Sequence, residues 1–332
     1  QSSLFPRFIS FFDRYIVLFC IYINELIDFD AEAKTVCVQP GLVLDQLNRF
    51  LKPHGLFYPV DVSTANRATL GGMTGNNSCG ARSIRYGNMV HNVLSVEAIL
   101  ADGSKAHFRR LDEGDGSVSK DLISHLLNLG RREADEINKR FPKLLRRVGG
   151  YNIDELTKGS PNLGSLLVGS EGTLGFFQKI HLKLQTIPKE KVLGVCHFPT
   201  FYEAMESTQH IVKLDPTAVE LVDRTMIDLA RAIPLFAPTV NRFVQGEPDA
   251  LLLVEFAGED RAEQLGKLAN LVELMADMGF PDSVVEATDD EFQPAIWEVR
   301  KQGLNIMMSM KGDGKPVSFI EDCAVDLKDL AE

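Results

Sequence analysis

Residues 69–80 read TLGGMTGNNSCG, a run dense in glycine and in short polar side chains. From Val62 to Val96 there is no acidic residue, although the stretch contains three arginines, Arg67, Arg82 and Arg85. Glycines let backbone N–H groups come close to a ligand and converge on phosphate oxygens. The stretch therefore predicts an anion-binding loop, and the alternative is an ordinary glycine-rich surface loop.

A second glycine cluster, GSEGTLG, occupies residues 169–175 inside an otherwise apolar, strand-like run. Glycine weakens a strand interior unless a backbone or a ligand approaches closely, and Glu171 is costly to bury without donors around it. A flat polar ligand against this segment explains both features. Neither the dinucleotide fingerprint G-x-G-x-x-G nor the phosphate loop G-x-x-x-x-G-K-[ST] is present at these glycines. A diphosphate would therefore need another architecture to hold it.

The first half of the chain reads as a mixture of strands and helices. Alternation around turn residues predicts hairpins at 26–41 and 93–108, and 166–184 reads as a strand. Apolar residues at helical spacing predict helices at 42–55 and 119–147.

The pattern of predicted strands and helices changes at Pro188, where we expect a domain boundary. The second half alternates strands and helices, which predicts an α+β domain with helices packed on one face of an antiparallel sheet. The expected strands are 192–198, 218–223 and 249–258, and the expected helices are 200–214 and 261–279.

Composition sets limits on function. The chain has 332 residues, a net charge of −11 and a pI near 5.2, which argues for two domains and against nucleic acid as the main partner. Its five cysteines include no C-x-x-C pair, so we expect reduced thiols in the cytoplasm. The leader 1–23 contains the apolar run YIVLFCIYI (15–23). That run is too short to span a bilayer and predicts a buried strand or helix, or sequence foreign to the fold.

Three separated motifs resemble the FAD-linked oxidase family, whose FAD-binding domain is of the vanillyl-alcohol oxidase and p-cresol methylhydroxylase (PCMH) type. They lie at 58–103, at 168–184 and at 146–154, where the chain reads RRVGGYNID. The closest branch comprises D-lactate, D-2-hydroxyglutarate and glycolate dehydrogenases, whose C-terminal domain is similar to this chain at AVELVD (218–223) and FIEDCAV (319–325). The resemblance implies an α+β fold in two domains.

The implied domains are the second part of a PCMH-type FAD-binding domain at 24–187 and an incomplete α+β, ferredoxin-like substrate (cap) domain at 188–332. The leader 1–23 is unmatched. Relatives carry a further FAD-binding half upstream and a histidine-rich motif downstream, and that motif supplies the catalytic base. The catalytic residue is therefore unknown, and no metal ligand is expected among the seven dispersed histidines.

The resemblance also implies which residues hold FAD. The backbone of the first cluster would line the diphosphate and ribityl chain, its amides the flavin, and the second cluster would complete the pocket. The residues are Pro59, Gly71, Gly72, Gly75, Asn76, Asn77, Ser78, Gly80, Tyr86, Gly87, Glu171, Gly172, Leu174 and Gly175. Arg82 or Arg85 would neutralise phosphate or pair with a carboxylate instead.

On the substrate side, Arg300 matches the arginine that relatives use for a carboxylate, and a guanidinium suits that role. The alternative is a solvated helix charge beside Glu298 and Lys301. Tyr151 and Asn152 are the further substrate-binding candidates, facing the flavin.

The implied activity is FAD-dependent oxidation of a D-2-hydroxy acid to the 2-oxo acid by a cytoplasmic enzyme, peripheral to the membrane at most. Electrons would pass to a respiratory or iron–sulfur acceptor. Two alternatives stay open at this point. One is the same FAD domain acting on another substrate, and the other is a non-catalytic fragment that binds a partner through an exposed apolar edge.

Overall fold

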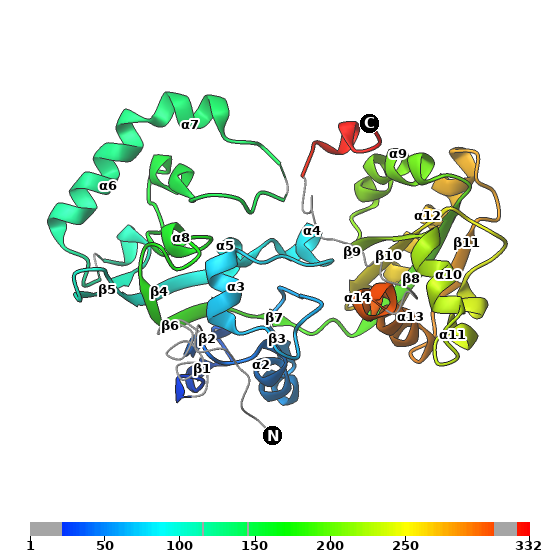
Figure 1. The fold of residues 1–332 in the computed structure, drawn as a ribbon, viewed down its shortest axis with the longest axis horizontal. Coiled ribbons are helices and arrows are strands. Elements are labelled where there is room, and N and C mark those ends of the chain that lie inside the picture. Colours follow the sequence, from blue (N-terminus) through cyan, green and yellow to red (C-terminus); the bar gives the residue numbers. More distant parts are fainter. Residues whose placement is uncertain (1–21, 115, 145, 309–323) are drawn as a thin grey trace, which may run out of the picture. The chain divides into compact units, whose positions relative to one another are not determined.

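The computed structural model describes residues 22–114, 116–144, 146–308 and 324–332, which form two units (Figure 1). Unit 1 comprises residues up to Gly80 together with Tyr86–Ile187. Unit 2 comprises Ala81–Arg85 and Pro188–Glu332. Nearly all of the leader and most of the FIEDCAV motif lie outside the described residues.

Unit 1 is built on a five-stranded antiparallel sheet in the order β1-β2-β6-β4-β5. Its strands are β1 (Leu26–Asp30), β2 (Thr35–Val38), β4 (Val93–Ile99), β5 (Lys105–Phe108) and β6 (Phe176–Lys183). Both hairpins are thereby confirmed. Alternate residues such as Val38, Val96 and Ile180 are fully buried in the core.

The strand prediction for 166–184 is wrong in its first half. Residues Gly164–Leu167 form helix α8, and the strand begins only at Phe176. Between them Gly169, Glu171 and Gly172 all have positive φ, a conformation that a regular strand cannot contain. The second glycine cluster is therefore a turn.

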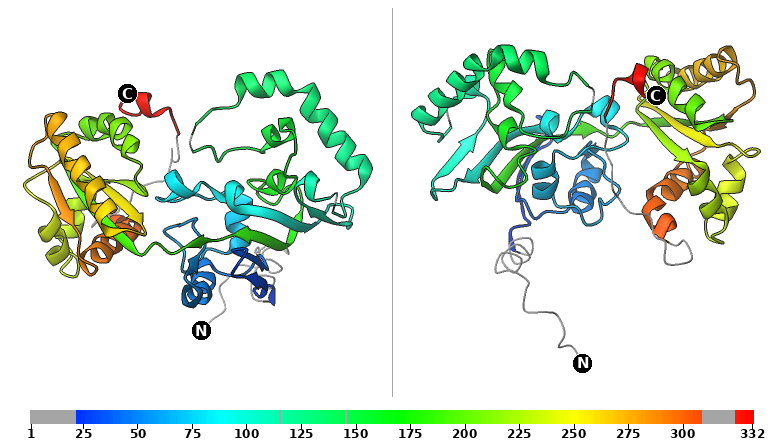
Figure 2. Two further views of the ribbon diagram at one scale, coloured as in Figure 1. Left: turned by 180° about the vertical axis from the view of Figure 1, so that it is seen from behind. Right: turned by 45° about the horizontal axis from the view of Figure 1, so that its top comes forward.

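The remaining elements of unit 1 are mostly short. Helices α6 and α7 stand apart from the sheet (Figure 2), and α6 packs against η3. The helix predicted over 119–147 ends at Arg140. The bounds are α2 (Leu44–Leu51), η1 (Lys52–His54), β3 (Leu56–Phe57), α3 (Leu70–Asn76), α5 (Met89–Asn92), η2 (Leu111–Glu113), α6 (Lys120–Arg132), α7 (Ala134–Arg140), η3 (Ile153–Thr157) and β7 (Gln185–Thr186).

Helix α3 forms where the sequence suggested a loop. Its segment LGGMTGN contains three glycines, which have poor helix propensity. The Thr69 side chain caps it by accepting a hydrogen bond from the Gly72 N–H, and Leu70, Met73 and Thr74 are buried. Packing therefore outweighs propensity here, as it does for most protein helices.

Unit 2 is a four-stranded antiparallel sheet in the order β11-β8-β10-β9. Its strands are β8 (Glu190–Phe198), β9 (Ala218–Asp223), β10 (Ala250–Gly258) and β11 (Val284–Ala287). The five strands and helices predicted after Pro188 are present. Its helices are α9 (Phe201–Ile211), α10 (Arg224–Arg231), α11 (Ala237–Phe243), α12 (Arg261–Asp277), α13 (Phe292–Lys301) and α14 (Gly303–Met308), with η4 (Val212–Leu214) and η5 (Leu327–Asp329).

Helices cover both faces of this sheet, so the expectation of one covered face is wrong. Leu193 and Leu253 pack with residues of α10, α11 and α13. Val254 and Phe256 pack with residues of α9 and α12 on the other face. Because β10 is buried on both faces, its apolar run does not alternate. Within the described residues no helix is both long and apolar enough to cross a membrane.

Candidate functional site

The two glycine clusters meet in unit 1, at the carboxyl end of α3. The Gly169 N–H donates to the Thr74 carbonyl at 2.9 Å, and the Glu171 N–H donates to the Gly75 carbonyl at 3.0 Å. The Asn76 amide donates to a Glu171 oxygen at 3.1 Å. Segments 95 residues apart thus form one surface, as expected for two halves of one ligand site.

Three buried polar atoms at this junction have no hydrogen-bond partner. They are Asn77 Nδ2, Asn88 Nδ2 and Ser170 Oγ, in residues that are at most 1% exposed. The Asn77 side chain uses its oxygen to accept from the Val90 N–H at 3.0 Å, and its Cβ lies near Gly169. Since buried polar groups are normally paired with protein, water or ligand, these atoms are hydrogen-bonding groups that a bound molecule at this junction would satisfy.

Four of the seven predicted glycines fall into two groups. A Cβ at Gly80 would collide with the carbonyl oxygen of Asp61, and one at Gly71 would collide with Pro40. These two glycines are explained by close packing inside the protein. By contrast, a Cβ at Gly75 would meet only ordinary contacts, and Gly172, at φ +75°, has open space around it.

The other predicted FAD residues lie around this junction or behind it. Pro59 is buried beside Tyr58. Tyr86 packs edge-on against Phe57, with ring centroids 5.7 Å apart. Leu174 is 38% exposed although it is apolar. Glu171 is exposed, so the expected cost of burying it does not arise. Gly72 is exposed, and Gly87 lies just before α5. The Ser78 hydroxyl donates to the Asn76 side-chain oxygen. Gly175 lies against the backbone of Ile99.

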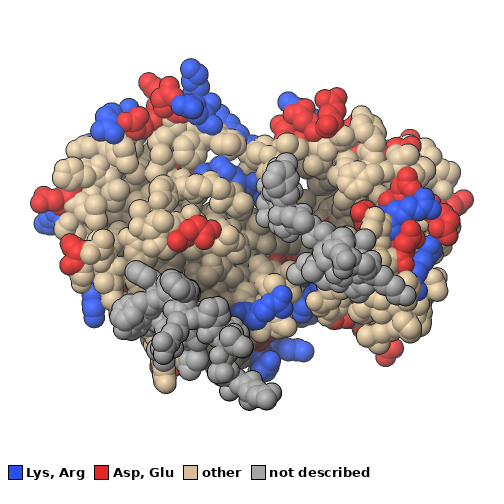
Figure 3. Space-filling view, in the orientation of Figure 1, with Lys and Arg blue, Asp and Glu red and all other residues tan. Residues whose placement is uncertain are grey.

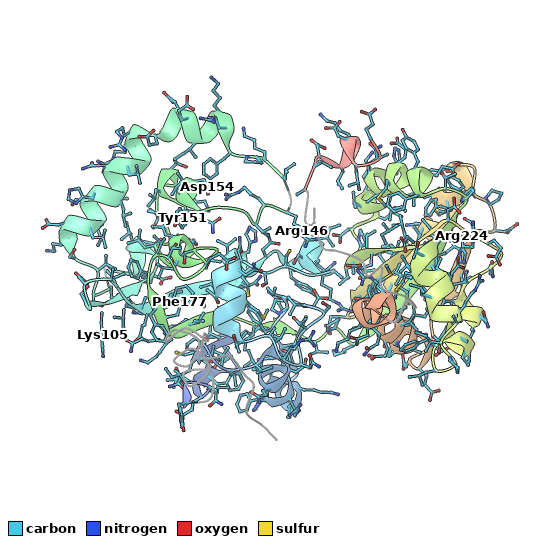
Figure 4. All side chains as sticks on the ribbon, in the orientation of Figure 1. Lys105, Arg146, Tyr151, Asp154, Phe177 and Arg224 are labelled. Atoms are coloured by element: carbon cyan, nitrogen blue, oxygen red, sulfur yellow. The ribbon has the colours of Figure 1, made fainter. Side chains whose placement is uncertain are left out.

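Tyr151, which is labelled in Figure 4, and Asn152 differ in whether their side chains reach solvent. Tyr151 is 45% exposed, and its hydroxyl lies 2.8 Å from that of Thr173 in the second cluster. Asn152 is buried, and its amide donates to the carbonyls of Ser165 and Val168. Tyr151 can therefore contact a ligand, whereas Asn152 holds the backbone that leads into the glycine turn.

The predicted substrate arginine lies in unit 2. Arg300, on α13, binds Glu220 of β9 through Nε at 2.8 Å and Nη2 at 2.7 Å. Its side chain is 37% exposed. The guanidinium therefore has a partner carboxylate and retains access to solvent.

Arg82 and Arg85 both pair with carboxylates of unit 2. Arg82 binds the buried Glu255 in a two-pronged arrangement, at 2.9 Å and 2.8 Å, and lies over the Trp297 ring at 5.4 Å. Arg85 lies 3.5 Å from Asp215, which is exposed. Of the two alternatives for these arginines, the structure shows pairing with carboxylates.

Sequence reasoning missed Ser170 and Glu255. Ser170 lies inside the quoted GSEGTLG motif, so its position between Gly169 and Glu171 could have revealed it. Glu255 is the acidic residue in the apolar strand β10, which itself signals a buried partner. In the part of the chain that the structure describes, no group of three His, Cys, Asp or Glu side chains is arranged to hold a metal.

Comparison with protein families identifies both units. Residues 10–109 match the FAD binding domain, and residues 187–332 match the C-terminal domain of FAD linked oxidases. The chain belongs to the FAD-linked oxidase family. The first match begins inside the leader that the sequence analysis treated as unmatched. The cofactor of the family is FAD, and the open, polar junction of the glycine clusters fits such a group.

Relatives of this family member include several dehydrogenases. D-2-hydroxyglutarate dehydrogenase of Pseudomonas putida is 30% identical and covers 97% of this chain and 34% of its own length. The Escherichia coli protein of that name is 32% identical, over 94% of this chain and 32% of its own. The Bacillus subtilis glycolate oxidase subunit GlcD is 26% identical, over 95% and 56%. The chain thus spans about a third of the first two relatives.

Among solved structures, an alkyldihydroxyacetonephosphate synthase superposes with a TM-score of 0.58 at 17% identity, over 86% of this chain and 45% of that one. This similarity confirms the mixed helix-and-sheet PCMH-type fold.

Proposed function

We propose that this FAD-linked oxidase acts in the oxidation of a D-2-hydroxy acid to the 2-oxo acid. The observation that carries the proposal is the junction of the two glycine clusters, where the exposed Asn76 and Glu171 are hydrogen-bonded to each other and neighbouring buried polar atoms lack partners. Relatives named D-2-hydroxyglutarate dehydrogenase align with 94–97% of the chain, which supports D-2-hydroxyglutarate as the first substrate to test, before D-lactate and glycolate.

Each proposed role follows from chemistry that the residue can supply. Ser170 and Asn77 would hydrogen-bond the flavin with atoms that now lack partners, and Asn76 and Glu171 would border it. When bound there, FAD would supply the acceptor for the hydride of the substrate carbon. Arg300 would bind the substrate carboxylate, because a guanidinium engages carboxylates in a fixed planar geometry. Its pairing with Glu220 holds that guanidinium in place.

We further propose a cytoplasmic location for the enzyme, with a respiratory or iron–sulfur protein as electron acceptor. The base that takes the hydroxyl proton is not assigned to any residue of this chain.

The test is a titration of the purified protein with FAD, followed by visible absorbance. We expect a bound-flavin spectrum that bleaches on addition of D-2-hydroxyglutarate and not of its L enantiomer. A protein that takes up no FAD would overturn the cofactor site. Bound flavin that no D-2-hydroxy acid bleaches would overturn the proposed reaction for this chain and leave the FAD site standing.

A variant at Ser170 tests whether this side chain contacts FAD. Ser170→Ala removes a hydroxyl that has no protein partner, so the apo protein should lose no stability. If the hydroxyl bonds FAD, the dissociation constant for FAD should rise about three- to tenfold, the equivalent of one hydrogen bond. An unchanged FAD affinity would remove Ser170 from the proposed site.

A further inference from the structure

A cavity of about 380 Å³ lies in unit 1, and Val90 on its wall donates a hydrogen bond to Asn77 of the glycine junction. The cavity opens to solvent and is lined by residues of α5 and α7, by residues 141–144 and 147, and by η3, and none of the candidate FAD or substrate residues lines it. Its volume falls at the lower end of the range for small-molecule sites. Figure 3 shows a hollow beneath the helices at the upper left, with Lys and Arg atoms inside it.

The charges on the cavity wall are mainly positive. Lys143, Arg147 and Lys158 line it, against one lining carboxylate, Asp154. Arg147 binds Asp154 at 2.8 Å, and Lys158 binds Glu155 at 2.6 Å. Among the described residues, no carboxylate pairs with Lys143. In a chain of net charge −11, this is a local concentration of cations.

His91 lies on the cavity wall, and its pKa is lowered there. Burial lowers the pKa of His91, and the positive charges of Lys158 and Arg147 lower it further. The ring is therefore neutral at pH 7. Its Nδ1 accepts from the Asn88 N–H at 3.0 Å, which leaves the ring proton on Nε2 as a donor.

The rest of the lining is mostly apolar, with Asn138 and Thr157 as its polar members. It includes Val90, Ile137, Phe141 and Leu144, and the Phe141 ring packs against the Arg147 guanidinium at 5.0 Å. A small inorganic ion would leave this apolar surface uncovered, and a neutral apolar molecule would leave Lys143 without a counter-charge. The lining fits a molecule that has both features.

We propose that this cavity binds a small organic anion, with an acidic group facing Lys143 and Arg147 and a compact apolar body against Phe141 and Ile137. The site is separate from the proposed oxidation of a hydroxy acid. Ligand pockets of this kind combine apolar walls with a few placed polar groups.

Calorimetric titration of the FAD-saturated protein tests the proposal, with 1-naphthoate as the probe. The matched probes are 1-naphthylmethanol, which lacks the charge, and inorganic phosphate, which lacks the apolar body. We expect one naphthoate per cavity and at least about tenfold weaker binding of each matched probe. Absence of naphthoate binding, or equal binding of either matched probe, would overturn the proposal.

Variants locate the binding. Lys143→Glu reverses the charge at an exposed lining position and should weaken naphthoate binding about tenfold or more. Lys139→Glu makes the same change on exposed α7 outside the lining and should leave binding unchanged. Asn138→Trp, exposed and in the lining, should weaken binding by filling the cavity.

Arg300→Gln separates this site from the proposed substrate site and should not alter naphthoate binding. Equal effects of Lys143→Glu and Lys139→Glu, or loss of binding in Arg300→Gln alone, would overturn the assignment.

Discussion

Glu255 shows how one side chain depends on a partner far away in the sequence. It is 1% exposed on a strand whose neighbouring side chains are apolar. An isolated carboxylate there would cost several kcal/mol of desolvation. Arg82, 173 residues away, meets it with two hydrogen bonds and so makes its burial tolerable.

Arg82→Ala should therefore destabilise unit 2 by about 3–5 kcal/mol, because it leaves a buried charge unpaired. The matched change Arg85→Ala breaks a pair with an exposed carboxylate and should cost about 0–1 kcal/mol. Urea unfolding of both variants measures the difference. Similar losses in the two would contradict this account of the Arg82–Glu255 pair.

His197 links the stability of unit 2 to pH. Burial lowers its pKa below 6.5. Its Nδ1 lies 2.9 Å from the Ser283 carbonyl. Its Nε2 accepts from the Gln245 N–H at 3.0 Å and also lies 3.1 Å from the Phe243 carbonyl. This arrangement fits a neutral ring with the proton on Nδ1.

A histidine with a lowered folded pKa binds a proton more readily when unfolded. Its contribution is present above the unfolded pKa of 6.5 and is lost as the pH falls below it toward the folded pKa. The free energy of unfolding should therefore decrease below pH 6.5, by at most about 1.4 kcal/mol per pH unit for this residue. His197→Gln should flatten that slope in unfolding titrations. An unchanged slope would show that His197 does not titrate in this window.

At the scale of elements, α3 and the glycine turn form one surface because their backbones hydrogen-bond to each other. A second close approach of two backbone segments lies just after α3. Gly80 follows α3, and a side chain there would collide with the Asp61 carbonyl. Backbone atoms cannot yield as the end of a flexible side chain can.

Gly80→Ala should lower the free energy of unfolding of unit 1 by about 1–3 kcal/mol, the range for overpacking. It should also weaken FAD binding, since Gly80 lies on the chain between α3 and Tyr86. Gly159→Ala is the matched control, because a Cβ there meets nothing within 4 Å. Thermal unfolding of the Gly80→Ala and Gly159→Ala proteins measures the difference in stability. A stable Gly80→Ala protein would mean that the Asp61 backbone can move.

At the scale of the whole molecule, each unit has hydrophobic core clusters of its own. One cluster lies under the five-stranded sheet, and two lie on either side of the four-stranded sheet. The proposed FAD contacts lie in unit 1, and the proposed substrate arginine lies in unit 2.

We expect unfolding of the protein to show two transitions, of which FAD shifts only the one that belongs to unit 1. At a free FAD concentration of 100 times the dissociation constant, the gain should be about 2.7 kcal/mol. Differential scanning calorimetry with and without FAD measures it, and Arg82→Ala identifies the transition of unit 2. A single transition, or equal shifts in both, would contradict independent cores.

The sequence by itself determined the elements whose signal is local. Alternation and turn residues located the hairpins at 26–41 and 93–108, and apolar spacing located α2, α9 and α12. The glycine clusters and the RRVGGYNID motif indicated the family, because backbone approach to a cofactor requires particular residues at particular positions.

Only the tertiary structure decided the rest, since those features depend on partners distant in the chain. Helix α3 forms against its own propensity because its apolar side is buried. The second cluster is a turn held by α3, and Arg82 is committed to Glu255. The sheet of unit 2 is covered on both faces because helices after β9 and β10 return to it. Contacts between residues 95 or 173 positions apart leave no periodic trace in the sequence, so packing alone establishes them.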